Sequence, residues 1–294
     1  MSVNSERIRT QIFRIRELPA LPLVVTRVLK LVSEPNASVQ DLNKIISSDV
    51  ALASKILRLA NSAYYGLSRQ VSTITEAVVY LGFNMVKAMA LSISVFDVLK
   101  GRGSCYKYFS REALWRHAIA CGVASRIIAR KIKLVDLETV FLAGLLHDIG
   151  KLVIDQYRNK EFKQILNLAE REHMLIMEAE QRIIGVDHTE VGYWLADWWK
   201  LPESLTSPIL GHHNSDIYLK NNIAAIVHVA NAICRELGLG NSGDEQSFKP
   251  DPKALAFLGL SANLASEIEE SLRHELENAE IFLSFARQEQ EASE

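Results

Sequence analysis

The chain has 294 residues, of which 48% are hydrophobic and 23% are charged, the composition of an ordinary soluble globular protein. Its 33 basic and 35 acidic residues nearly cancel, so no overall field attracts nucleic acid or an anionic membrane. Its three cysteines, Cys105, Cys121 and Cys234, are odd in number and widely scattered, which favours free thiols over a disulfide framework.

The first residues and the most apolar run of the sequence indicate the cellular compartment of the protein. The first residues, Met1 to Glu6, lack the basic-then-apolar pattern of a secretory signal. The most apolar stretch, Ala88 to Phe96, is too short to cross a bilayer, which needs about 20 residues. Together with the scattered cysteines, these features predict a cytoplasmic protein.

Apolar residues in the first hundred positions recur with helical spacing. Ser38 with Asp41, and Thr73 with Glu76, form capping-box patterns that mark helix starts. Gly82 marks a break between two helices. Helices are expected over 24–32, from 38, over 50–60, from 73, and over 85–98.

The rest of the chain continues the helical pattern, and no convincing alternating strand appears. Lys100–Ser104 has the composition of a linker, and Gly238–Pro252 that of a long exposed loop. Helices are expected near 110–132, 136–148, 160–183, 188–199, 203–213, 222–237 and 264–286. The sequence therefore predicts an all-α protein in three segments: an N-terminal helical lobe (1–104), a histidine-rich lobe (105–237), and a loop with a C-terminal helical extension (238–294).

An adjacent histidine and aspartate stand at the end of a strongly apolar helix. His147 and Asp148 follow the run Thr139–Leu146, and Gly150 is expected to end the helix just after them. An unpaired charge in such a place costs several kcal/mol. Two partners would remove that cost: a divalent cation, for which imidazole and carboxylate are usual ligands, or a hydrogen-bonded His–Asp pair that locks the helix end.

Four further histidines also stand at or near helix ends. His117 lies on the helix before the His–Asp pair, and His188 begins a helix that Asp187 can cap. His212 and His213 end the helix expected over 203–213. Each alone could be a core histidine with satisfied hydrogen bonds, but helical bundles build metal sites by projecting such ligands inward from facing helices.

Other chemistries lack support in the sequence. There is no glycine-rich phosphate loop and no strand–turn–helix nucleophile elbow. The aromatic group Tyr193, Trp194, Trp198 and Trp199 has helical spacing without interleaved basic residues, so it predicts core packing and not base stacking.

A combination of segments resembles a known family. The segments are Leu18–Pro22, Ser48–Leu52, Ile56–Gly66, Thr73–Gly82, Gly144–Lys151, Asp187–Gly192, Trp199–Pro202 and His212–His213. Together they resemble the HDOD domain of bacterial signalling proteins, a relative of the HD and HD-GYP metal-dependent phosphohydrolases, over about residues 18–235. The resemblance implies a helical HD-domain-like bundle and a stand-alone signalling protein.

The resemblance also implies a set of metal ligands. HD-type hydrolases are similar to this chain at His117, His147, Asp148, His188, His212 and His213. Their last ligand is an aspartate, where this chain has Asn231. Asparagine offers a neutral carbonyl oxygen without a negative charge, so binding of the implied divalent ion (iron, zinc or manganese) should weaken.

Two functions follow from the resemblance. The first is a non-catalytic regulatory module with a protein partner in a signalling pathway, in which the turn Asn61–Gly66 implies an interaction surface. The second is a metal-dependent phosphohydrolase that acts on a nucleotide or phosphodiester, with Asp148 and Lys151 as catalytic residues. Independently of both, Asn61, Ser62 and Tyr64 follow an apolar helix, and we expect them to have a structural role first.

Overall fold

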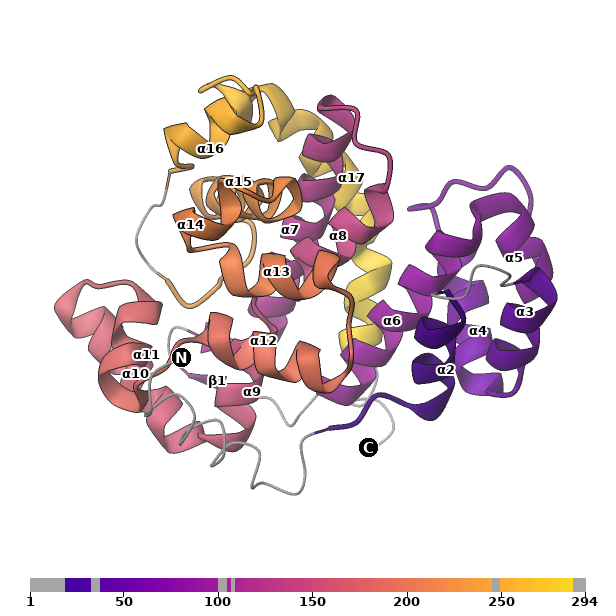
Figure 1. The fold of residues 1–294 in the computed structure, drawn as a ribbon, viewed down its shortest axis with the longest axis horizontal. Helices are drawn as coiled ribbons and strands as arrows, with labels where there is room; N and C mark the ends of the chain where they lie inside the picture. Colours follow the sequence, from indigo (N-terminus) through magenta and orange to yellow (C-terminus); the bar gives the residue numbers. More distant parts are fainter. Residues whose placement is uncertain (1–18, 33–37, 100–104, 107–108, 245–248, 288–294) are drawn as a thin grey trace. The chain divides into compact units, whose positions relative to one another are not determined.

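The computed structural model describes residues 19–32, 38–99, 105–106, 109–244 and 249–287, which are almost entirely helical (Figure 1). The predicted all-α fold is therefore confirmed. Contacts divide these residues into two units, which are described separately: a histidine unit of residues 105–272, and an N-terminal unit of residues 19–99 with 273–287. The residues after 237 are thus shared between the two units instead of grouping as a third segment. The predicted linker Lys100–Ser104 lies outside the described residues.

Five helices and the end of a sixth build the N-terminal unit. They are α2 (Leu23–Val32), α3 (Val39–Ser47), α4 (Val50–Ala60), α5 (Ile74–Leu81), α6 (Phe83–Leu99) and the part of α17 (Leu264–Arg287) from residue 273 onward. Both predicted capping boxes are present, because Ser38 and Thr73 accept hydrogen bonds from the amides of Asp41 and Glu76. Phe282 of α17 is fully buried in this unit.

The α6 helix is buried on nearly all sides, which explains its continuous apolar sequence. Among the described helices, none is by itself long and apolar enough to cross a bilayer. Only α5 and α6 taken together, with a bend of 120° between them, satisfy the length and composition of a span.

Asn61 closes the turn after α4 with two hydrogen bonds to one residue. Its Nδ2 donates to the carbonyl oxygen of Val71, and its Oδ1 accepts from the Val71 amide, both at 2.8 Å. Ser62 Oγ donates to the Leu59 carbonyl at 2.7 Å, and Tyr64 packs edge-on against Phe282 with ring centroids 5.2 Å apart. The expected structural role of these side chains agrees with these contacts.

Replacing Asn61 with alanine should therefore destabilise the protein. The substitution removes both hydrogen bonds to Val71, but Asn61 itself is exposed and water can replace part of them, so the free energy of unfolding should fall by about 1 kcal/mol. Denaturant unfolding followed by circular dichroism measures the change. Gln70→Ala, an exposed position in the same turn region, is the control and should have little effect. An unchanged stability in Asn61→Ala would point to a partner surface instead.

The histidine unit contains a two-stranded hairpin and the remaining helices. The strands β1 (Cys105–Tyr106) and β2 (Phe109–Ser110) pair antiparallel. The helices are α7 (Arg111–Lys131), α8 (Leu137–Leu146), α9 (Ile149–Tyr157), α10 (Asn159–Glu172), α11 (Ile176–Ile184), α12 (His188–Trp198), α13 (Glu203–Gly211), α14 (Ser215–Tyr218), α15 (Asn222–Glu236), α16 (Pro252–Phe257) and the start of α17.

Two expectations about helix boundaries are wrong. The single helix expected over 160–183 is two helices, because α10 ends where His173 takes a left-handed conformation with φ +51°. Gly150 does not end a helix: α9 begins at Ile149, directly after Asp148, and Gly150 lies in its first turn. The chain thus runs from α8 into α9 with only His147 and Asp148 between them.

Glycines allow the close helix contacts that bring these residues together. In the histidine unit α7 packs against α8 and α15, α9 against α12, and α13 against α8, α12 and α15 (Figure 1). A Cβ on Gly144 would lie 2.6 Å from the Cys121 carbonyl oxygen, which shows how closely α8 approaches α7. A Cβ on Gly150 would overlap the carbonyl oxygen of His188. The absence of a side chain at Gly150 therefore lets Asp148 lie beside His188.

Candidate metal centre

Three histidines surround the carboxylate of Asp148. His147 Nε2 lies 3.3 Å from Asp148 Oδ2. His188 Nε2 and His212 Nε2 lie 3.3 Å and 3.6 Å from Asp148 Oδ1. All four side chains are at most 2% exposed. The sequence prediction that these four residues converge agrees with this geometry.

Helix ends position each of the four side chains. His147 is the C-cap of α8 and Asp148 the N-cap of α9, so the sharp junction between two helices presents both groups together. His188 is the first residue of α12, whose N-cap Asp187 accepts hydrogen bonds from the amides of Thr189 and Glu190. His212 is the C-cap of α13.

Hydrogen bonds on the outer side of each ring determine which nitrogen carries the proton. His147 Nδ1 lies 2.7 Å from the Gly144 carbonyl oxygen, and His212 Nδ1 lies 3.0 Å from that of Ile209. A carbonyl oxygen only accepts, so Nδ1 is the donor in both rings, and Nε2 of the neutral ring carries a lone pair. The Nδ1 of His188 also faces an acceptor, which is a carboxylate oxygen instead of a carbonyl oxygen.

Glu180 is that carboxylate, and the sequence analysis missed it. Its Oε2 accepts from both the backbone amide of His188, at 2.8 Å, and the Nδ1 of the same residue, at 2.7 Å. Metal-bound histidines commonly have such a carboxylate on the second ring nitrogen. Its signal was present in the sequence: Glu180 interrupts the apolar stripe of Ile176 and Ile184 at helical spacing, which places an acid on the buried face of α11.

The inward-facing atoms have no hydrogen-bond partner. Nε2 of His147, His188 and His212 and Oδ1 of Asp148 are all buried and unsatisfied. Three imidazole lone pairs pointing at a carboxylate repel it unless a cation lies among them. A proton on one ring would remove part of this repulsion, whereas a divalent ion would bind all four atoms. The residues therefore fit a divalent ion with nitrogen and oxygen ligands, such as zinc, iron or manganese.

Lys151 adds a buried positive charge to the centre. Its Nζ lies 2.9 Å from Asp148 Oδ2, and the side chain is 1% exposed. The carboxylate of Asp244 lies 3.9 Å from the same Nζ and accepts a hydrogen bond from the Ile176 amide. Asp244 belongs to the loop that the sequence predicts to be exposed. Its side chain is nevertheless only 4% exposed, because its carboxylate faces the ammonium group of Lys151.

The other three predicted ligands lie next to these four residues. His117 Nε2 lies 3.1 Å from Asn231 Oδ1, and its Nδ1 lies 3.3 Å from the Leu239 carbonyl oxygen. The His213 ring lies 4.2 Å from that of His212, measured between centroids. That any of these residues binds an ion stays a prediction, but all seven lie in one region of the histidine unit.

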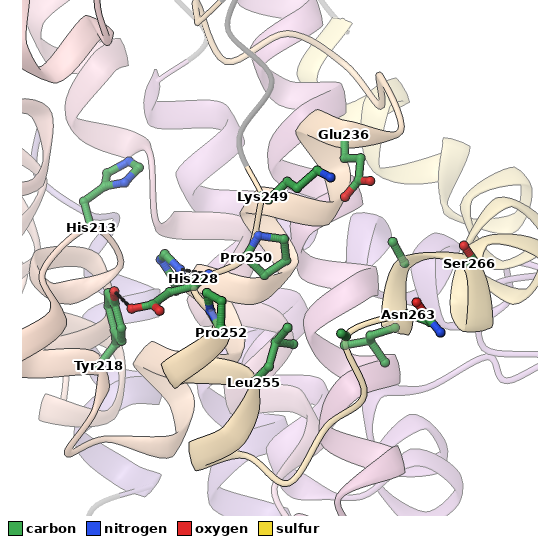
Figure 2. Close-up of a pocket in the computed structure, with 14 residues that line it drawn as sticks. His213, Tyr218, His228, Glu236, Lys249, Pro250, Pro252, Leu255, Asn263 and Ser266 are labelled. Carbon is green, nitrogen blue, oxygen red and sulfur yellow. Dashed lines mark hydrogen bonds between the residues drawn. The ribbon is translucent and has the colours of Figure 1, made fainter.

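His228 contacts the centre through a backbone group. Its Nδ1 donates to the carbonyl oxygen of His212 at 2.8 Å, and its Nε2 accepts from the Asp251 amide at 3.2 Å. Its ring stacks on Tyr218, whose hydroxyl donates to the Asp251 carboxylate at 2.7 Å. These residues line a cavity of about 710 Å³ together with His213 and the start of α17 (Figure 2). His228 therefore supports the end of α13 and does not act as an inward-facing ligand.

Burial makes several of these histidines hard to protonate. It lowers the pKa of His117 to about 3 and that of His212 to about 4, and it holds the pKa of His213 well below its ordinary value. Burial is the largest single influence on His188 and opposes its charged form, but the Glu180 and Asp148 carboxylates together outweigh it and raise the His188 pKa. Burial raises the pKa of Glu180 itself.

The ion-free protein should consequently lose stability as the pH falls from about 6.5 to about 4. In this range the unfolded chain protonates the first three histidines at their ordinary pKa of 6.5, while the folded chain does not, so protons favour unfolding. Glu180 has the opposite effect on stability, because its raised pKa means that the folded state binds its proton more readily than the unfolded chain does. This effect involves one proton, whereas the three histidines involve three. The stabilising effect of the raised His188 pKa is fully present below pH 6.5 and is lost only as the pH rises through that pKa.

Melting temperatures of chelator-treated protein between pH 4.5 and 7 measure this dependence. His212→Gln should flatten the curve, because it removes one of the groups that only the unfolded chain protonates. His274→Gln, at an exposed position, is the control and should follow the wild type. A wild-type melting temperature that rises on acidification would contradict the neutral state of these histidines.

Comparison with known proteins gives a family. The sequence profile of the HDOD domain matches residues 18–215. An uncharacterized protein of Treponema pallidum (strain Nichols) is 26% identical over 202 residues, which are 68% of this chain but 38% of that protein. The chain thus spans well under half the length of this relative.

Solved structures share the fold over almost the whole chain. An HDOD domain protein with unknown function from Geobacter sulfurreducens is 28% identical, with 97% of each chain covered and a TM-score of 0.79. A candidate phosphohydrolase from Shewanella amazonensis SB2B is 21% identical, with 96% of this chain and 98% of that chain covered and a TM-score of 0.73. The second likeness concerns the fold alone. On the profile match, which covers most of its length, the chain belongs to the HDOD domain family.

Proposed function

We propose that this chain is a regulatory HDOD module of a signalling pathway, in which a divalent ion held by Asp148 and its three histidines has a structural role. The burial of the donors carries this proposal: His147, His188 and His212 are 0% exposed and Asp148 is 2% exposed. A catalytic ion keeps an open position for water and substrate, whereas a structural ion is enclosed by its ligands. An ion among these four side chains would be enclosed.

The positions of the ligands suggest what such an ion would control. It would join the α8–α9 junction to the start of α12 and the end of α13, so its gain or loss would change the rigidity of three helix ends at once. Ion binding to the folded state stabilises it by mass action. The module would then present a partner surface whose stability depends on the ion.

The regulatory part of this proposal is compatible with the fold of a solved signalling protein. A candidate signal transduction protein from Marinobacter aquaeolei VT8 is 24% identical with a TM-score of 0.74, and this chain covers 60% of it. The likeness by itself concerns the fold. We infer a protein partner for this chain as well, with the signal passed on by binding and not by turnover.

Metal analysis combined with a hydrolysis assay tests the proposal. Protein purified without a histidine tag should contain a divalent ion, and Asp148→Ala and His188→Ala should lose the ion that Asp148 and the three histidines hold. None of the three proteins should hydrolyse phosphodiesters or nucleotides with added Mn²⁺. Robust wild-type turnover that disappears in both variants would overturn the regulatory proposal, and activity unaffected by either variant would indicate a contaminant.

One observation favours a metal-dependent phosphohydrolase as the second candidate. A buried cationic group, Lys151 Nζ, lies 2.9 Å from Asp148 Oδ2, where it could neutralise phosphate charge. A bound ion would supply a water of lowered pKa and polarise a phosphoryl oxygen. Lys151 would hold the phosphate beside it.

Asn231→Asp distinguishes the two candidates. In a regulatory module the added carboxylate should tighten ion binding, because it lies beside His117, without producing turnover. In a weakened hydrolase it should also raise hydrolysis, by about 10–100-fold for a change of this kind. Ion affinity and hydrolysis rates of the variant are measured together. Asn241→Asp, at an exposed position, is a control for added charge.

A further inference from the structure

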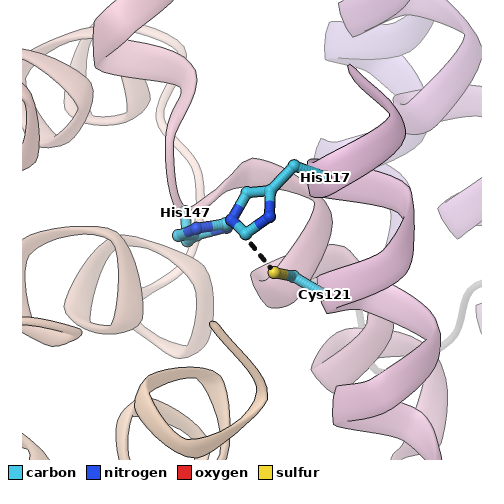
Figure 3. A group of neighbouring side chains, drawn as sticks. All are labelled: His117, Cys121 and His147. Atoms are coloured by element: carbon cyan, nitrogen blue, oxygen red, sulfur yellow. Dashed lines mark hydrogen bonds between the residues drawn. The ribbon is translucent and has the colours of Figure 1, made fainter. Parts of the chain in front are cut away.

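We propose that Cys121 is a thiolate ligand of a second ion position, which it forms with His117 and His147 (Figure 3). This position lies outside the group of four donors around Asp148, and none of the seven ligands implied by the sequence is a cysteine. The proposal is independent of whether the protein turns over a substrate. It requires only that the histidine unit binds ions.

The spacing of the donors fits one ion. His117 and Cys121 are four residues apart on α7, so both side chains leave the same face of the helix. Cys121 Sγ lies 3.4 Å from His117 Nε2, and these two atoms and a His147 ring nitrogen all lie within 4.8 Å of one another. Nitrogen and sulfur ligands of one tetrahedral zinc, at about 2.0–2.3 Å from the metal, lie roughly 3.3–3.8 Å apart.

The hydrogen bonds of His117 leave one electron pair of its ring facing an oxygen atom. Its Nδ1 lies 3.3 Å from the Leu239 carbonyl oxygen and its Nε2 lies 3.1 Å from Asn231 Oδ1. A neutral ring has one N–H, so in either tautomer one nitrogen lone pair faces an oxygen. With Nδ1 as the donor, the Nε2 lone pair faces Asn231 Oδ1, and in the ion-free protein the thiol proton of Cys121 or a reversed Asn231 amide can donate to it. A cation bound by the Cys121 thiolate would take the place of that proton and remove the repulsion between Nε2 and Oδ1.

His147 supplies a donor that either ion position can use. Its Nε2 is fully buried and has no hydrogen-bond partner, while its Nδ1 is held by the Gly144 carbonyl. Since Nε2 has one lone pair, His147 binds one ion at a time. When both positions are filled, the first retains Asp148, His188 and His212, with His213 close enough to join them.

The chemistry of the donors selects the ion. Two imidazole nitrogens and a thiolate suit a borderline-soft ion such as Zn²⁺, Fe²⁺ or Co²⁺, and not Mg²⁺ or Mn²⁺, which prefer oxygen. The Cys121 thiolate also carries a negative charge. Asn231, which contacts His117, is neutral and brings no charge to the cluster. Cys121 therefore compensates for the missing carboxylate at position 231.

Cobalt substitution tests the proposal, because a cobalt–thiolate bond gives a charge-transfer band in the near ultraviolet. Chelator-stripped protein is titrated with Co²⁺ while the absorbance is recorded. The wild type should develop the band, and Cys121→Ser should lose it. Cys234→Ser changes a second fully buried thiol that forms a hydrogen bond with Cys121; it tests which of the two thiols binds cobalt and should retain the band. Circular dichroism of each variant verifies that it is folded.

The results separate this position from the centre around Asp148. His188→Ala should bind one cobalt fewer and retain the charge-transfer band, because it leaves His117, Cys121 and His147 intact. Cobalt binding without a band in the wild type, a band that persists in Cys121→Ser, or a band that disappears in Cys234→Ser would each overturn the second position. A band that appears without any His188-dependent cobalt would leave the second position standing and contradict the first.

Discussion

Replacing Asp148 with asparagine should abolish the stabilisation of this protein by Mn²⁺, an ion that the nitrogen and sulfur donors of the Cys121 position do not favour. Asp148 is the one carboxylate that all three inward-facing histidines approach, within 3.3–3.6 Å. The amide keeps the shape of the side chain but removes its negative charge. Its Nδ2 can also donate to the lone pairs that would otherwise bind the ion. Both effects act against ion binding at this centre, so the variant should melt at the same temperature with and without Mn²⁺.

The wild type should respond strongly in the same experiment. An ion at 100 times its dissociation constant stabilises the folded state by about 2.7 kcal/mol. At about 2–4 °C per kcal/mol for a domain of this size, the melting temperature should rise by roughly 5–10 °C. Asp216→Asn removes an exposed carboxylate from the same unit and should retain the whole response. A full metal-induced shift in Asp148→Asn would rule out the ion centre described above.

The second large effect is expected for Gly150→Ala, although alanine is ordinarily the better helix former. The new methyl group would overlap the carbonyl oxygen of His188 and would lie 2.8 Å from the Gly192 amide nitrogen. Both neighbours are backbone atoms, so α9 must move away from α12. Overpacking of this kind typically destabilises by 1–3 kcal/mol, and here it also separates Asp148 from His188. We expect a loss of both stability and ion affinity.

Gly192→Ala is the matched control, since it lies in the same contact between α9 and α12. Its Cβ would meet a methyl group of the Ile209 side chain at 2.9 Å as its nearest neighbour, and a side chain can turn aside more easily than backbone. It should therefore have the smaller effect. Melting temperature and cobalt affinity are measured for both variants. Equal stability and equal affinity for Gly150→Ala and wild type would show that the close approach has no role in forming the centre.

Local signals determined most of the helices and the identity of the inward-facing donors. The capping boxes at Ser38 and Thr73 act within one helical turn, so the sequence is sufficient to predict them. His147 and Asp148 could be selected because polar groups after a strongly apolar run require partners whatever the fold. The prediction for Gly150 was wrong because it considered only the local tendency of glycine to end a helix. The structure shows that glycine is needed at this position for the close contact between α9 and α12.

Only the tertiary structure showed which groups complete the centre. Glu180 and Asp244 lie in different segments from the atoms they contact, and their burial depends on how α11 and the loop after α15 fold back onto α9 and α12. The partnership of Cys121 with His117 follows from helical spacing, but the approach of His147 to both depends on the contact between α7 and α8 that Gly144 allows. The sequence thus determined the chemical types of the ligands, because these are properties of single residues. Their convergence was decided by packing between helices, because distances between residues far apart in the chain are set by the tertiary fold.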